Sequence, residues 1–214
     1  MAEQPVRVDV WSDYVCPFCF LVEPTLEQLR KDYGESVQVH WRAFELRPEP
    51  VPTLDPAGEK LRSTWQRVVY PMAEEREMTI RLPPVQPRSR KAFEAAQFAR
   101  EAGKFDAFHP VLFRAFFLEG RDIGELAVLR ELAASVGLDG EALGRALAEG
   151  RYTERVVRDR EQALAAGVTG VPAMLVLASE ATQGVMVSGT QPYEVLQEAL
   201  EHARRGPLPP KPPA

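Results

Sequence analysis

Two short segments near the beginning of the chain alternate hydrophobic and polar residues, as a β-strand with one buried face does. Residues 6–10 read Val-Arg-Val-Asp-Val, and residues 37–43 repeat the two-residue period. Between them, apolar residues recur at helical spacing over residues 17–33, and Gly34 is a common type of helix stop. This order predicts a βαβ unit with parallel strands and a right-handed crossover.

The middle of the chain, residues 55–166, has a helical period and no convincing strand pattern. Asp122 and Asp139 are the expected N-caps of two of its helices. Phenylalanines at helical spacing between residues 105 and 117 are expected to form core rather than a binding surface. The predicted helices cover residues 57–69, 89–102, 105–118, 123–136, 140–148 and 152–166.

Strand patterns return after this helical segment. Residues 172–177 and 185–188 are apolar runs joined by a short polar loop with a glycine, which predicts an antiparallel hairpin. Pro192 then opens a final amphipathic helix. The predicted class is α/β, in the order β-α-β, helical insertion, β-β-α. We expect a discontinuous domain at 1–54 and 167–206, the helical insertion at 55–166 and a disordered, proline-rich tail at 207–214.

The composition is that of a globular protein, since 45% of the 214 residues are hydrophobic and 27% are charged. The formal net charge is −5, with both signs mixed along the chain. That mixture offers no basic stripe for nucleic acid and no polybasic anchor for membranes, so neither partner is expected. The first residues do not follow a secretory signal pattern, and we expect a cytoplasmic protein. No pattern predicts an oligomeric state.

The two cysteines, Cys16 and Cys19, lie one helical turn apart where the first strand pattern gives way to the first helix pattern. Unpaired N–H groups and the positive end of the helix dipole favour a thiolate at that position. Pro17 suits the first helical position, because the N–H that it lacks has no partner there. Two sulfurs on one turn can close a redox-active disulfide, and we expect no other cofactor.

Two alternatives exist for the cysteine pair. A zinc site needs two more ligands, usually at short spacing. The chain has no third cysteine, and its histidines, His40, His109 and His202, are far apart, so no metal is predicted. The cysteines could also be inert structural residues, but a strand, a C-P-x-C motif and a helix in this order favour redox chemistry.

The order of elements resembles the thioredoxin fold, and the long helical insertion between its halves resembles the DsbA branch of that fold. The segment from Ser12 to Cys19 is similar to the start of the FrnE group within the DsbA-like family. Residues 167–172 resemble the loop that carries the cis-proline of the fold, and residues 188–192 resemble the turn before the last helix in that group. The resemblance extends from the first strand to about Arg205.

The resemblance implies a thiol-disulfide oxidoreductase that exchanges disulfides with protein substrates. Cys16, on the exposed side of the helix start, is then the nucleophile, and Cys19 is the resolving thiol. Pro17 and Phe18 are expected at the substrate-binding surface. Val171 and Pro172 are expected there too, with a cis bond between them that leaves the backbone of Val171 free to pair with an extended substrate.

Resolution requires a proton transfer near Cys19, and the carboxylates nearest in sequence are Asp13 and Glu23. Both are candidates for the proton relay, although the simpler interpretation of each is a solvated carboxylate on the surface.

Two other functions compete with protein disulfide exchange. The first is a glutathione-dependent reaction, because the family resembled includes 2-hydroxychromene-2-carboxylate isomerase and the kappa-class glutathione transferases. Those proteins characteristically have serine where Cys16 stands, and the intact thiol pair here favours exchange, with glutathione as a possible reductant or substrate. The second is a redox-linked chaperone or interaction module that uses an apolar groove beside Cys16.

Overall fold

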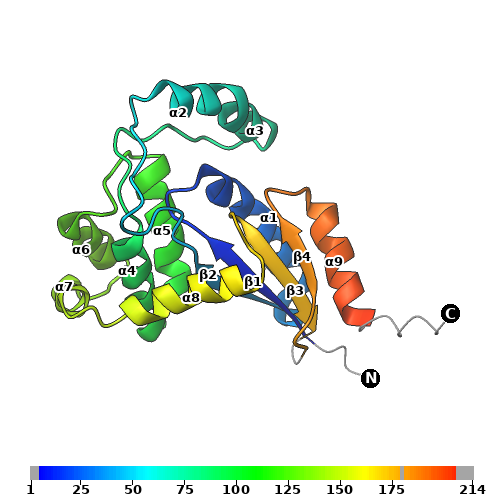
Figure 1. The fold of residues 1–214 in the computed structure, drawn as a ribbon. Helices are drawn as coiled ribbons and strands as arrows, with labels where there is room; N and C mark the ends of the chain where they lie inside the picture. The colour runs from blue at the N-terminus through cyan, green and yellow to red at the C-terminus, as the bar shows by residue number, and fades with distance from the viewer. Residues whose placement is uncertain (1–4, 179–180, 206–214) are drawn as a thin grey trace.

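The computed structural model of the protein describes residues 5–178 and 181–205 (Figure 1). Fourteen elements larger than one turn follow one another in these ranges. They are β1 Val6–Ser12, α1 Pro17–Tyr33, β2 Val37–Ala43, α2 Glu59–Thr64, the π-helical segment η2 Trp65–Val69, α3 Tyr70–Glu75, α4 Arg90–Glu101, α5 Phe105–Phe117, α6 Leu126–Ser135, α7 Gly140–Ala148, α8 Thr153–Ala165, β3 Ala173–Ala178, β4 Val185–Ser188 and α9 Tyr193–Arg205.

The strands form one sheet in the order β2-β1-β3-β4. Strands β1 and β2 are parallel, with Val6 opposite Val37, whereas β1 with β3 and β3 with β4 are antiparallel. The predicted βαβ unit and the predicted hairpin are therefore both confirmed. The α/β thioredoxin-like class is confirmed with them. The predicted tail at 207–214 and part of the turn after β3 lie outside the described residues.

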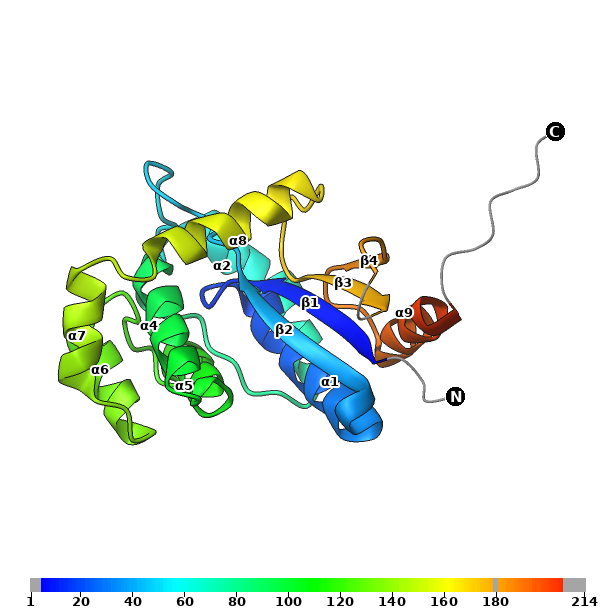
Figure 2. The same ribbon diagram turned by 90° about the horizontal axis from the view of Figure 1, so that it is seen from below.

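Helices cover both faces of the sheet, as Figure 2 shows with α1 and α8 on opposite sides. On one face, alternate residues of β1 from Val6 to Val10 pack in a single apolar cluster with α1 and α9. On the other face, Trp11 packs against α8, and its indole Nε1 donates to the carbonyl of Asp159 at 3.1 Å. The expectation of one buried face is therefore wrong, because Asp9, which alternates with the apolar residues of β1, is also buried and pairs with Arg42 at 3.3 Å.

The helical block between β2 and β3 differs from the prediction at its first helix. Helical structure continues past Val69 as α3, because a π-helical turn at Trp65–Val69 joins α2 to α3 without a break. The predicted phenylalanine core is confirmed, since all five rings between Phe105 and Phe117 are buried.

The two predicted N-caps have different outcomes. Asp139 caps α7, and its carboxylate accepts hydrogen bonds from the N–H groups of Glu141 and Ala142. Asp122 does not cap α6. Its carboxylate instead accepts from the Gly124 N–H at 2.8 Å in a turn, and the helix begins only after Glu125. The cap prediction failed at Asp122 because the local side-chain turn competes for the same oxygen.

We expect Asp139→Ala to lower the free energy of unfolding and the urea midpoint measurably, because two amide N–H groups of α7 lose their acceptor. Asp139→Asn keeps an acceptor oxygen and should keep most of that stability. Urea unfolding of the two variants measures the difference. Equal losses in both would show that charge rather than capping is responsible.

Neither a membrane-spanning helix nor a metal cluster is found in the part of the chain that the structure describes. No helix there is long and apolar enough to cross a bilayer. No group of three or more histidine, cysteine, aspartate or glutamate side chains in those ranges could hold a metal ion.

Candidate functional site

The two cysteines begin helix α1. Cys16 is its N-cap residue, with extended backbone angles (φ −93°, ψ 116°), and Pro17 occupies the first turn. The Cys16 carbonyl accepts from the N–H of Cys19 at 3.1 Å, which places the two residues on one turn. Both thiols are free, and the first turn of α1 carries no acidic side chain. The helix start therefore presents its positive end to Cys16 without an opposing charge.

Cys16 is less exposed than expected, with only 4% of its surface open to solvent. The loop before β3 lies against it, and the Cys16 thiol donates to the carbonyl of Val171 at 3.6 Å. The bond between Val171 and Pro172 is cis, as the family resemblance implied. A second cis bond, between Glu49 and Pro50, was not anticipated.

Cys19 is fully buried beneath the helix start. The backbone N–H of Asp13 donates to the Cys19 sulfur at 3.4 Å. Burial raises the pKa of the Cys19 thiol well above its ordinary value, and the neighbouring Cys16 raises it further. The Asp13 N–H and the nearby Ser12 hydroxyl oppose that rise. The site thus contains one thiol at a surface opening and one thiol held protonated in the interior.

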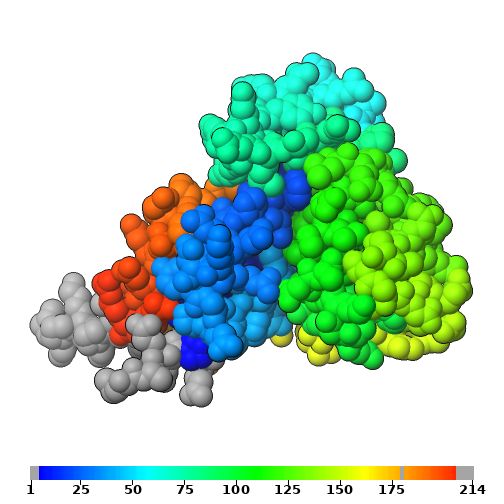
Figure 3. All heavy atoms as spheres, turned by 180° about the vertical axis from the view of Figure 1, so that it is seen from behind, coloured from blue at the N-terminus to red at the C-terminus, as the bar shows by residue number. Residues whose placement is uncertain are grey.

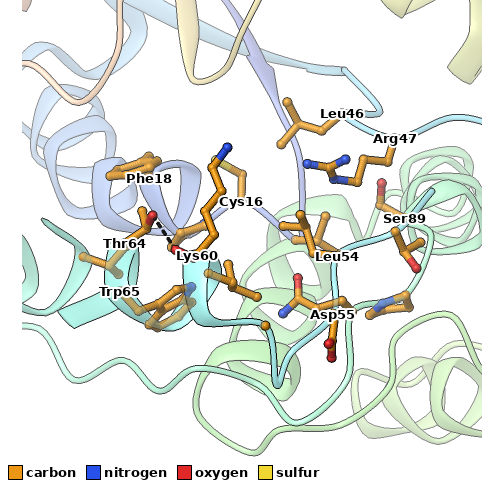
Figure 4. Close-up of a pocket in the computed structure, with 18 of the residues that line it drawn as sticks. Cys16, Phe18, Leu46, Arg47, Leu54, Asp55, Lys60, Thr64, Trp65 and Ser89 are labelled. Carbon is orange, nitrogen blue, oxygen red and sulfur yellow. Dashed lines mark hydrogen bonds between the residues drawn. The ribbon is translucent and has the colours of Figure 1, made fainter. Parts of the chain in front are cut away.

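A cleft of about 590 Å³ opens over Cys16. In Figure 4, Lys60 and Thr64 of α2 and Trp65 of η2 lie on the side of the cleft near Cys16 and Phe18, and the loop with Leu46 and Leu54 lies on another side. Figure 3 shows the segment with α2 and α3 above the start of α1. The lining comes from residues 15–18, 46–47, 53–55, 58–69 in part, 86–89 and 170–171. All the predicted substrate-binding residues except Pro172 line this cleft.

Asp13 is buried, but its carboxylate is directed to the wall of the cleft rather than to Cys19. One oxygen accepts from the Leu46 N–H at 2.8 Å, the other accepts from the Val15 N–H at 3.3 Å, and Ser89 also bonds to it. Burial raises the pKa of Asp13 to about 6, although these hydrogen bonds oppose the rise. The carboxyl group therefore fixes the loop at Leu46 beside the helix start.

Glu23 belongs to a different network. Its carboxylate lies 3.2 Å from Nε2 of His109, and the Tyr14 hydroxyl lies 2.8 Å from Nδ1 of the same ring. Because an ionised carboxylate only accepts, we assign the proton to Nε2, so that the Tyr14 O–H donates to Nδ1. The three side chains form a continuous chain of hydrogen bonds beneath the site.

Tyr14 and His109 are not among the site residues that the sequence predicts. His109 was considered only as a metal ligand, yet it lies four residues after Phe105 and four before Phe113 on the same helix face. A single titratable residue within a buried aromatic face was the signal that could have identified it. Lys60 and Arg47 were also missed, because nothing local relates them to the cysteines.

Cations outnumber anions at the cleft even though the chain is acidic. Arg47, Lys60 and Arg88 line it, against Asp55. The Arg47 guanidinium donates to the carbonyl of Pro52 at 3.2 Å, and Arg88 pairs with Glu49 at 3.4 Å. Among the described residues, no carboxylate lies within ion-pair distance of Lys60 or Arg47, so both can face an anionic group.

The profile of the family described as "DSBA-like thioredoxin domain" matches residues 7–201. The uncharacterized protein YwbO of Bacillus subtilis is 38% identical over 204 residues, which cover 94% of this chain and 98% of that protein.

Several solved structures are also similar to this chain. The probable DsbA oxidoreductase SCO1869 of Streptomyces coelicolor has a TM-score of 0.79 at 26% identity, with 96% of this chain and 93% of that chain covered. Two structures below 25% identity share the fold. The cytosolic disulfide reductase DsbM of Pseudomonas aeruginosa, solved with GSH, has a TM-score of 0.66 at 20% identity, covering 93% and 96%. A 2-hydroxychromene-2-carboxylate isomerase has a TM-score of 0.74 at 21% identity, with 93% of this chain and 96% of that chain covered.

Proposed function

The chain belongs to the DSBA-like thioredoxin domain family, and on that premise we propose that it exchanges disulfides with protein substrates through Cys16 and Cys19. The observation that carries the proposal is the asymmetry of the pair. The Cys16 thiol opens on a cleft at the positive end of α1, whereas Cys19 is buried one turn further on. An attacking thiol and a resolving thiol need those two environments.

The reaction proceeds in two exchanges. The Cys16 thiolate attacks one sulfur of a substrate disulfide, a mixed disulfide forms, and the other substrate sulfur leaves as a thiolate that takes a proton from water. Cys19 then loses its proton and attacks the Cys16 sulfur, so that the bound substrate leaves as its second thiol. The pair is left as a disulfide, which an external thiol reduces. Its reduction potential relative to that of the surrounding thiols sets the direction.

Apolar side chains around the cleft favour protein substrates. Of the seven large hydrophobic residues that are exposed in the described ranges, five belong to the segment 46–70, which supplies part of the cleft lining. They are Leu46, Val51, Leu54, Val68 and Tyr70. An unfolded chain presents apolar segments that these side chains can contact. Val171 lies beside Cys16 at the start of β3, where an extended substrate segment could pair as an added strand.

Reduction of insulin by dithiothreitol in the presence of the protein tests this proposal. We expect catalysed precipitation of the insulin B chain, and we expect it to stop when the reduced protein is first alkylated with iodoacetamide. A chaperone activity survives alkylation and suppresses the aggregation of a heated reporter protein. Insulin reduction at the uncatalysed rate would contradict the proposal.

A glutathione-dependent reaction is the second candidate. The observation that favours it is the pair of cations at the cleft, since Arg47 and Lys60 could hold the two carboxylates of a glutathione molecule whose sulfur lies near Cys16. Glutathione could then act as the reductant of the Cys16–Cys19 disulfide or as a co-substrate. Conjugation and isomerisation assays with glutathione distinguish the second role, and the intact thiol pair leads us to expect no turnover in either.

Leu54→Gln should weaken the binding of protein substrates specifically. Removal of an apolar contact of roughly 1 kcal/mol raises KM for insulin about fivefold, without changing the rate with a small neutral disulfide such as 2-hydroxyethyl disulfide. Met186→Gln is the matched control, because Met186 and Leu54 are both 37% exposed and Met186 lies on β4, away from the cleft. An equal effect of the two variants would contradict a specific role of Leu54.

We also propose that the chain is of the FrnE type and works in the cytoplasm. The Ser12 to Cys19 motif supports the first point, together with the turn after β4, where the Thr190 hydroxyl donates to the Phe18 carbonyl at 3.4 Å. The cysteine usage supports the second, because both cysteines belong to the exchange pair and none is left for a structural disulfide.

A further inference from the structure

A small cavity, separate from the substrate cleft, lies between β1, β2, α4 and α5. Ser12, Tyr14 and His109 line it, together with Gln97 and Arg100 of α4. The space open to a water-sized sphere is about 10 Å³. This volume is close to the lower limit of roughly 10 to 15 Å³ that one water molecule needs.

Three buried polar atoms around this cavity have no hydrogen-bond partner within the described ranges. They are Ser12 Oγ, Gln97 Oε1 and Arg100 Nε. Ser12 is 4% exposed and Gln97 is 6% exposed, so bulk water does not solvate them. A buried polar group without a partner costs roughly 1 to 3 kcal/mol. Three such groups around one small cavity provide the two to four polar partners that an internal water requires.

The same cavity connects two parts of the site. On one side, Ser12 directly precedes Asp13, whose backbone N–H donates to the Cys19 sulfur at 3.4 Å, and the Ser12 hydroxyl favours the Cys19 thiolate. On the other side, Tyr14 and His109 begin the hydrogen-bonded chain that ends at Glu23. Glu23 is partly exposed, with 22% of its side chain open to solvent, so the chain runs from the interior to the surface.

We propose that the cavity binds one water molecule and that this water completes a proton path from Cys19 through Ser12, Tyr14 and His109 to Glu23. The inference rests on the proposed function, because Cys19 must lose its proton to resolve the mixed disulfide. The path leaves through the interior of the protein, so that a substrate occupying the cleft over Cys16 does not block it.

The protons and electrons balance in one concerted step. The Cys19 proton passes to the Ser12 oxygen, the Ser12 proton passes to the water, and a water proton passes to the Tyr14 oxygen. The Tyr14 proton moves to Nδ1 of His109, whose imidazolium is stabilised by the Glu23 carboxylate. The Cys19 thiolate forms the new bond to the Cys16 sulfur, and the old bond from Cys16 breaks with its electron pair on the departing substrate sulfur. His109 then returns its extra proton to solvent through Glu23.

Two arginines from neighbouring elements line the cavity through which this path runs. Arg100 of α4 faces it, and its guanidinium lies 3.9 Å from the centre of the Phe105 ring and donates to the Trp41 carbonyl at 3.2 Å. Arg42 of β2 lines the same cavity, but Asp9 and Asp159 balance its charge. Glu23 is the only carboxylate among the described residues that bonds to His109, so it is the terminal acceptor.

Stopped-flow reaction of the reduced protein with 5,5′-dithiobis(2-nitrobenzoate) tests the path, because each step releases one coloured thiolate. The first phase reports attack by Cys16, and the second reports resolution by Cys19. We expect Tyr14→Phe to slow the second phase about tenfold or more and to leave the first within twofold. Ser12→Ala should show the same slow second phase. Ser12→Thr keeps a hydroxyl and should react in the second phase at the rate of the unmodified protein. Tyr152→Phe is the matched control, because its hydroxyl bonds to Glu101 and neither residue lines the cavity.

The pH profile separates a proton path from a structural effect. Without the path, Cys19 loses its proton to hydroxide, so the second phase in Tyr14→Phe should accelerate about tenfold per pH unit above neutrality, more steeply than in the unmodified protein. An unchanged second phase in Tyr14→Phe and Ser12→Ala, or equal slowing of both phases, would overturn the inference. If the unmodified protein releases no thiolate, it is the proposed function that fails. Should Tyr14→Phe not fold, the two Ser12 variants carry the same test.

Discussion

Replacement of Cys16 by serine is expected to lower the rate of insulin reduction about a thousandfold or more, to the uncatalysed rate. The thiolate is the attacking species in disulfide exchange, and a serine hydroxyl ionises far too weakly to replace it. No other thiol can substitute, because Cys19 is fully buried and does not line the cleft. The measurement is the initial rate of insulin reduction at fixed dithiothreitol, corrected for the reaction without protein.

Cys19→Ser is the informative companion to this variant. It keeps the attacking thiol and removes the resolving one, so it should form a mixed disulfide with insulin that mass spectrometry detects as a covalent adduct. Cys16→Ser should form no such adduct. Circular dichroism and the melting temperature establish that both variants fold. Substantial turnover in folded Cys16→Ser would show that the asymmetric pair is not the reacting group.

Local patterns were enough to place the reactive pair. Helix α1 begins at Pro17 and ends at Tyr33, as predicted, because its stop signal and its first-turn proline act within one turn of the chain. The position of Cys16 at the N-cap follows from the same short segment. The order of strands and helices could also be predicted, since each element has its own period.

Long-range contacts could not be predicted in the same way. The bond between Tyr14 and His109 joins residues 95 apart in sequence, and the bond between His109 and Glu23 joins residues 86 apart. Both depend on how α5 packs against the start of α1, which no local pattern specifies. The second buried face of the sheet was missed for the same reason, because Trp11 packs with Ala163 of α8, which lies more than a hundred residues away in sequence.

Sequence proximity to Cys19 does not specify which atoms the two predicted relay carboxylates contact. Asp13 and Glu23 were chosen because they lie near Cys19 in the chain. In the structure, the Asp13 backbone touches the Cys19 sulfur, but its carboxylate bonds to Leu46 and Val15 on the cleft wall. Within the described ranges, Glu23 is hydrogen-bonded to the interior through His109. The two carboxylates thus belong to different networks, and we infer a positioning role for Asp13.

The stability of the protein should depend on pH through Asp13. Burial raises the pKa of this carboxyl from 3.8 to about 6 in the folded protein, so folding disfavours the ionised form. A shift of this size corresponds to about 3 kcal/mol. The sign follows from linkage, because the folded state holds the proton to a higher pH than the unfolded state. The contribution of the protonated Asp13 carboxyl to stability is therefore fully present below pH 3.8, decreases as the pH rises, and is lost above about pH 6.

Asp13→Asn should remove this dependence, because asparagine does not ionise. The measured quantity is the difference in free energy of unfolding between the unmodified protein and the variant, from urea titrations at pH 3.5 to 7.5. We expect the difference to fall by about 3 kcal/mol over that range, whatever constant offset the lost hydrogen-bond acceptor adds. Asp55→Asn, at an exposed carboxylate of the same cleft, should leave the pH profile unchanged. A constant difference for Asp13→Asn would mean that the carboxyl stays ionised where it is buried, and that its hydrogen bonds to Leu46 and Val15 outweigh the loss of solvation.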